Sequence, residues 1–147
     1  MTWKKELDEL REREALAEKM GGPEKVAKQH ERGKLDARAR LSAFCDPCTF
    51  REIGKISGTA TYNENGNLEK ILPAPFIFGK ALVNGRPVVA TADDFTIRGG
   101  AADAGIKRKM VQAEKMAHEM KLPLIRMIDG TGGGVSVKTL EQIGATY

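Results

Sequence analysis

Aromatic residues, long apolar runs and cysteines are all scarce in this 147-residue sequence. Aromatics make up 5% of the chain, too few for a platform that stacks nucleic-acid bases. The apolar runs are too short to cross a bilayer. The first twenty residues contain no apolar signal core, and they carry too many acids for an organelle transit peptide. We therefore expect a cytoplasmic protein that is not embedded in a membrane.

Charge is plentiful but mixed in sign. The net charge of +4 and the pI of about 9.1 would suit a nucleic-acid partner. However, 20 acids interleave with 24 bases, and no dense basic stripe is present. We predict no nucleic-acid partner, whereas a local cationic patch for a phosphorylated small molecule stays open. The hydrophobic content of 41% indicates a globular chain.

The two cysteines, Cys45 and Cys48, lie in the motif FCDPCTF. A two-residue gap can chelate zinc or support thiol exchange. Zinc would need two further ligands, and His30 and His118 have no matching spacing. A redox pair would stand at a helix start after a strand, whereas Asp46 and Pro47 resemble a turn after a helix. We favour structural or incidental cysteines and predict no metal site.

The first third of the chain predicts helices. A narrow apolar stripe that includes Leu7 and Leu10 runs through a charged segment at residues 3–20. Pro23 is placed to open a second helix, and Asp36 to cap a third. Such an arm is too polar to build a core by itself. We expect it to wrap another surface.

From residue 50 onward the pattern predicts strands, turns and one long helix. Asn84-Gly85 separates two β-rich runs, and Asn-Gly is the preferred pair for a tight hairpin. A helix is predicted over residues 102–120 and a short buried strand over 122–128. The helix residues expected to face a core are Ile106, Met110, Ala113, Ala117 and Met120. The order of elements indicates an α/β fold.

A glycine cluster follows that strand and precedes a predicted helix over residues 135–145. Its members are Gly130, Gly132, Gly133 and Gly134. Such a turn lets a ligand approach the main chain, and the helix start aims free N–H groups at negative charge. Two phosphate-binding signatures match only in part, because Val137 replaces a P-loop glycine and Val135 replaces the third glycine of a dinucleotide fingerprint. A simple tight turn and an oxyanion site both stay open.

The sequence shows no pair of nucleophile and base beside this turn. His30 and His118 have no evident Ser or Cys partner, and the carboxylates are scattered over charged helices. Backbone N–H groups can nevertheless stabilise a developing oxyanion. Donors without a base suit a reaction in which the substrate or a cofactor supplies the base.

Several motifs in one order resemble a known family. GGPEKVAKQHERGKLDARARLSAFCDPCTFREIG is similar to the family run GGxxKxxxQHxxGKLTARERI followed by LLDPGSFxE. LVNGRPVVATADDFTIRGG is similar to INGRPVxVxxxDFTVxGGS, and MIDGTGGG stands where the family has DSGGAR or DSGGAN. The chain thus resembles the N-terminal region of the carboxyltransferase β subunits of biotin-dependent acyl-CoA carboxylases, such as the propionyl-CoA and methylcrotonyl-CoA enzymes. The resemblance covers nearly the whole chain.

The resemblance implies a crotonase-like fold, a spiral of repeated β-β-α units. It also implies a longer chain with a second domain, so that this sequence would be an N-terminal fragment. We expect a helical arm at residues 1–45 and the incomplete opening part of the acyl-CoA-binding domain at residues 46–147. The fragment alone would be inactive.

The implied reaction moves a carboxyl group between carboxybiotin and the α-carbon of an acyl-CoA thioester. Biotin would supply the base, and backbone amides would stabilise the enolate. The matching positions for these amides are Gly132, Gly133 and Gly134. The implied partners are a biotin carboxylase with its biotin carrier and further copies of the same chain in a homo-oligomer.

The same resemblance suggests a CoA contact at residues Gly99, Gly100, Lys107 and Lys109. The lysines open a helix whose dipole favours phosphate. A solvated basic face is the alternative for each lysine.

Three departures from the family pattern indicate a divergent branch. They are one extra residue in the turn Gly130-Thr131-Gly132, Val135 in place of Arg or Asn, and Cys48 in place of Gly. Two other functions stay open. One is a biotin-dependent acyl-CoA decarboxylase subunit, and the other is a non-catalytic module for CoA binding or assembly.

Overall fold

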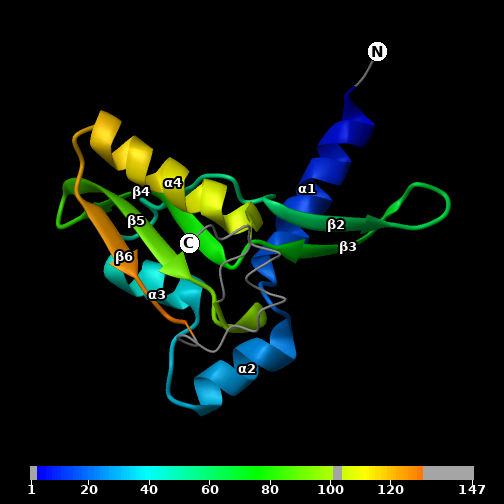
Figure 1. Cartoon of the computed structure of the whole chain (residues 1–147), viewed down its shortest axis with the longest axis horizontal. Helices are drawn as coiled ribbons and strands as arrows, with labels where there is room; N and C mark the ends of the chain where they lie inside the picture. The colour runs from blue at the N-terminus through cyan, green and yellow to red at the C-terminus, as the bar shows by residue number, and fades with distance from the viewer. Residues whose placement is uncertain (1–2, 101–103, 131–147) are drawn as a thin grey trace, which may run out of the picture.

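A computed structural model describes residues 3–100 and 104–130, with three helices leading into a mixed α/β body (Figure 1). The elements in chain order are α1 (Lys4–Glu18), α2 (Pro23–Glu31), α3 (Ala37–Phe44), β1 (Arg51–Glu52), β2 (Gly58–Tyr62), β3 (Leu68–Pro73), β4 (Phe76–Val83), β5 (Arg86–Asp93), the 3₁₀ turn η1 (Arg98–Gly100), α4 (Ala104–Glu119) and β6 (Leu124–Met127). The predicted helix over residues 135–145 lies outside the described residues. In the described part of the chain, no helix is long and apolar enough to cross a membrane.

The central hairpin, β4 and β5, forms where the Asn-Gly pair predicted it. Asn84 and Gly85 both adopt positive φ, at 50° and 74°, as a two-residue turn of matching twist requires. The carboxylate of Asp46 accepts hydrogen bonds from the backbone N–H groups of both turn residues, at 2.9 and 2.8 Å. The CDPC turn therefore caps this hairpin.

The main sheet has the order β1-β4-β5-β6. β5 and β6 are parallel, with Val89 opposite Leu124 and Ala92 opposite Met127, and α4 makes the crossover between them. β4, β5 and α4 therefore form one β-β-α unit. The carboxyl ends of β5 and β6 meet at the same edge of the sheet.

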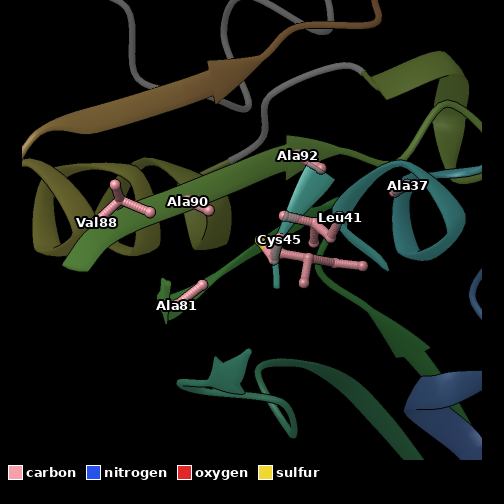
Figure 2. Close-up of a cluster of buried hydrophobic side chains, with 8 residues drawn as sticks. Ala37, Leu41, Cys45, Ala81, Val88, Ala90 and Ala92 are labelled. Carbon is pink, nitrogen blue, oxygen red and sulfur yellow. The ribbon is translucent and has the colours of Figure 1, made fainter. Parts of the chain in front are cut away.

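Each face of the sheet is covered by one helix (Figure 1). On one face, Leu41 and Cys45 at the end of α3 pack against alanines and Val88 of β4 and β5 (Figure 2). On the other face, Ala113 and Ala117 of α4 pack against Phe76, Phe78 and Val89 of β4 and β5 in a second apolar cluster. α3 thus belongs to the core although it lies in the predicted arm. The boundary after residue 45 stays a prediction.

The arm predicted over residues 1–45 contains α1, α2 and α3. α1 lies against β3 of the separate β2–β3 hairpin, and Leu7 and Leu10 remain exposed (Figure 1). α2 begins at Pro23 as predicted. Asp36 caps α3, since its carboxylate accepts a 2.9 Å hydrogen bond from the N–H of Ala39.

Two expectations about burial were wrong. Met120 is 45% exposed, because α4 ends at Glu119 and the helical phase no longer applies beyond it. Ile128 is 72% exposed, because β6 ends at Met127. Ala113 and Ala117 are buried as predicted, and Met110 is half-buried.

Candidate active site

Polar residues gather where the parallel strands β5 and β6 end. Asp93 is the last residue of β5, and Asp129 follows β6. The N–H of Asp129 donates to the carboxylate of Asp93 at 3.3 Å, which links the two strand ends. Ligands of open α/β sheets bind beyond the carboxyl ends of the strands. This edge is therefore the candidate site.

Two glycine segments that are far apart in sequence meet at this edge. Gly99 and Gly100 have φ of 64° and 71°, the left-handed region that favours glycine. A Cβ on Gly100 would lie 2.3 Å from the carbonyl oxygen of Asp129 and 3.4 Å from Cα of Gly130. Only glycine allows this approach. The structure thus brings the candidate CoA glycines beside the start of the glycine cluster.

The remaining predicted site residues divide between the helix and the end of the chain. Gly132, Gly133 and Gly134 lie outside the described residues. Lys107 lies in the first turns of α4, and its side chain is outside the described part of the structure. The N-terminus of this 16-residue helix comes four residues after Gly100. The first N–H groups of a helix have no partner within the helix, so this position suits an anionic ligand.

Lys109, the other predicted CoA lysine, lies inside the protein. It is 7% exposed and lines a cavity of about 10 Å³ with Arg38 and Glu52, room for no more than one water molecule. Desolvation lowers the pKa of Lys109 to about 8, although the charge of Glu52 opposes this change. Arg38 already pairs with Glu52 at 2.8 Å. This placement favours a structural role over a direct phosphate contact.

Two acids lie at the end of β5, the half-buried Asp93 and the buried Asp94. Burial raises the pKa of Asp93 and also that of Asp94. Asp94 accepts hydrogen bonds from the backbone N–H and the hydroxyl of Thr96. The Thr96 hydroxyl also accepts a 2.9 Å bond from the N–H of Gly21 in the arm. Asp94 therefore shapes a turn on which the arm rests.

The arm also reaches the end of β6. Nε2 of Gln29 donates to Oδ2 of Asp129 at 3.0 Å. Nζ of Lys34 lies 3.5 Å from Oδ1 of the same carboxylate, and the Arg40 guanidinium lies 3.8 Å from Oδ2. In Figure 1 the chain leaving β6 runs past α3 toward α2. One carboxylate therefore ties three side chains of the arm to the candidate site.

Gln29, Arg40 and Asp129 were missed as site residues. A glutamine or arginine on a charged helix resembles a solvated face, and an acid before a glycine cluster resembles a turn former. The one available signal was that all three lie within the motifs that carry the family resemblance. Their distances from one another only appear after folding.

Neither cysteine is among the residues described at this edge. Across residues 3–100 and 104–130, no group of three or more His, Cys, Asp or Glu side chains could hold a metal ion. Cys45 and Cys48 are both free thiols. Burial raises the pKa of Cys45, which lies in the core. Its position agrees with the structural interpretation.

Comparisons with known proteins give the family. A sequence model described as "Carboxyl transferase domain" matches residues 28–147, most of the chain. The chain belongs to this carboxyl transferase family. The match begins within α2 and includes Gln29, Arg40 and Asp129. The contacts that the arm of this carboxyl transferase chain makes with Asp129 thus lie within the family region.

Two curated relatives agree with this membership. The carboxyltransferase subunit of propionyl-CoA carboxylase from Haloferax mediterranei is 36% identical over 92% of this chain and 26% of its own length. The methylmalonyl-CoA carboxyltransferase 12S subunit from Propionibacterium freudenreichii subsp. shermanii is 32% identical over 88% of this chain and 25% of its own length. This carboxyl transferase chain spans about a quarter of these relatives.

A solved structure confirms the fold. The crystal structure of transcarboxylase 12S matches with a TM-score of 0.78 and 30% identity, over 98% of this chain and 27% of that one. That protein is described as a hexamer, with methylmalonyl-coenzyme A and methylmalonic acid bound. The expected crotonase-like carboxyltransferase fold, present in part, is therefore confirmed.

Proposed function

We propose that this chain is all or part of a carboxyltransferase that moves a carboxyl group between carboxybiotin and the α-carbon of an acyl-CoA thioester. The observation that carries the proposal is the family match over residues 28–147. The contact of Gly100 with Asp129 adds support, since it joins the two segments expected to bind CoA and the thioester.

The segments beside the strand ends are suited to binding an acyl-CoA. The N-terminus of α4 offers N–H groups to phosphate, and Gly99 and Gly100 allow the backbone to lie close to a ligand. We assign Lys107 to this CoA contact. Because Lys109 is buried against Arg38 and Glu52, we expect it to anchor α4 to α3 and β1. The acyl-CoA would then enter at the edge where β5 and β6 end.

The chemical step would depend on the backbone amides of Gly132, Gly133 and Gly134. When bound, carboxybiotin supplies the carboxyl group and the base. The amides would hold the thioester oxygen as negative charge develops on it during removal of the α-proton. One such donor is worth about 10²–10³ in kcat. No general-base side chain is then required.

The proposed protein works with other components. The biotin would arrive on a separate carrier that a biotin carboxylase loads, and copies of the chain would associate into a homo-oligomer. We also propose a cytoplasmic location. The same site would serve in the reverse direction as an acyl-CoA decarboxylase subunit, and direction would depend on the coupled partners.

The test is transfer of labelled bicarbonate to acyl-CoA by the native protein, of which this chain is all or part. The assay contains biotin carboxylase, biotinylated carrier and propionyl-CoA or methylcrotonyl-CoA. We expect carrier-dependent labelling. Gly133→Pro, which removes an N–H, should lower kcat by about 10²–10³ with little change in KM. Gly133→Ala, which keeps the N–H, is the control. CoA binding without any transfer in either direction would indicate a binding module and contradict the proposal.

A further inference from the structure

Asp129 immediately precedes the glycine cluster, and its carboxylate accepts a hydrogen bond from the N-terminal arm. Gln29 is 100 residues away in the chain and donates to it at 3.0 Å. The Asp129 carbonyl oxygen is the atom against which Gly100 packs. Both ends of this residue are therefore engaged, its carboxylate by the arm and its carbonyl by the η1 turn.

Gln29 is an unusual member of its helix. α2 is mostly exposed, yet Gln29 is 4% exposed and is the buried residue of that helix. A buried amide costs free energy unless its hydrogen bonds are made. Bonding to a carboxylate is stronger than bonding to a neutral acceptor. The buried position of α2 is therefore occupied by a side chain that makes a polar contact with the candidate site. An apolar residue at this position would have anchored the helix to the body by packing alone.

Arg40 holds the same region from α3. Its guanidinium donates to the carbonyl oxygens of Asp93 and Met127, and it approaches the carboxylate of Asp129. One planar cation thus contacts the ends of both parallel strands. Since guanidinium donors have fixed directions, this contact fixes both strand ends relative to α3.

We propose that Gln29 and Arg40 are positioning residues for the carboxyltransferase site, holding Asp129 so that the backbone leaves β6 in the direction the oxyanion amides require. This inference rests on the proposed function. In this proposal neither side chain acts directly on the reacting atoms. Their effect passes through Asp129, and a misplacement of about 1 Å at a reacting centre can lower the rate about 100-fold.

The test compares Gln29→Glu with Gln112→Glu in the native protein. Gln29→Glu keeps the size of the side chain and places a carboxylate against that of Asp129. Gln112→Glu makes the same change at an exposed position of α4. We expect Gln29→Glu to lower kcat about 10–100-fold, corrected for the folded fraction, with KM for acyl-CoA within about twofold. Gln112→Glu should match the wild type.

A pH series adds a readout that lost packing would not reproduce. Once protonated, the carboxyl group that Gln29→Glu introduces can again donate to Asp129. The kcat of this variant relative to wild type should therefore recover as pH falls. Burial and the Asp129 carboxylate should raise the pKa of the introduced acid above its ordinary value of about 4.3, and the cations Lys34 and Arg40 oppose this change. Arg40→Lys keeps the charge and should retain more activity than Arg40→Met, and this pair carries the test if Gln29→Glu fails to fold.

The outcomes separate this inference from the function on which it rests. A wild-type protein without carboxyl transfer overturns both. An active wild type with unchanged kcat in Gln29→Glu and Arg40→Met overturns the positioning role alone. A loss of activity that only parallels the loss of folded protein, with no recovery at low pH, also overturns it.

Discussion

The middle of strand β5 and its carboxyl end lie in contrasting environments. In the middle, Val89 and Ala90 are fully buried between α3 and α4, and the contacts are apolar on both faces of the sheet. At the carboxyl end, Asp93 and Asp94 lie among a guanidinium, hydroxyls and backbone amides. Apolar packing holds the sheet together, whereas hydrogen bonds with directional demands hold the site. The first region should govern stability and the second should govern geometry.

The largest effect is expected from the apolar region. Phe78→Ala removes a side chain that is nearly fully buried under α4 and should lower the free energy of unfolding by about 3–5 kcal/mol. Urea unfolding of the 147-residue chain measures it. Phe44→Ala makes the same change at an exposed position and should cost less than about 1 kcal/mol. Equal losses would show that the described core is wrong.

An intermediate effect is expected where the two glycine segments touch. Gly100→Ala places a Cβ 2.3 Å from the Asp129 carbonyl oxygen and should cost about 2–4 kcal/mol by the same measurement. Gly66→Ala is the matched control, since its φ of 75° is similar but a Cβ there meets no atom within 4 Å. It should cost only the backbone strain, about 1–2 kcal/mol. Identical losses would argue against the contact.

The smallest effect is expected from Lys109, whose substitution should raise the free energy of unfolding and not lower it. Because burial lowers the pKa of Lys109 to about 8, below its ordinary value of 10.5, the unfolded chain binds more protons between these values. The free energy of unfolding should therefore rise as pH increases from about 8 to 10.5. Lys109→Met should remove this rise and stabilise the chain at neutral pH by roughly 1–3 kcal/mol.

Lys115→Met is the control for that titration, because Lys115 lies on the exposed side of the same helix. It should keep the rise between about pH 8 and 10.5. A wild-type chain whose stability is flat over this range would show that Lys109 is not held in the described cavity.

Local sequence signals predicted most elements because local physics decides them. Asn84-Gly85 favours a tight turn whatever surrounds it, and Asp36 caps α3 through a bond to a residue three positions away. Met120 and Ile128 show where such reasoning ends. Each continued an apolar pattern past the end of its element, where the periodicity no longer describes the side chain's direction.

The site could be predicted only in part. The family resemblance suggested Gly99 and Gly100 as CoA contacts, which stays a prediction. Their place beside the start of the glycine cluster appears only in the folded chain, where Gly100 packs against Asp129. Lys109 was grouped with Lys107 because both are basic and lie near a helix start. Burial of Lys109 depends on the facing β1 and α3, which no local pattern encodes.

The sequence by itself determined the helices, the central hairpin and the family resemblance, because turn chemistry, caps and periodicity act over a few residues. The tertiary structure alone decided that Gln29 and Arg40 meet Asp129, 100 and 89 positions away from them. A contact across that separation exists only after α2 and α3 dock and β6 joins the sheet. The sequence around any one of these three residues therefore does not reveal the other two.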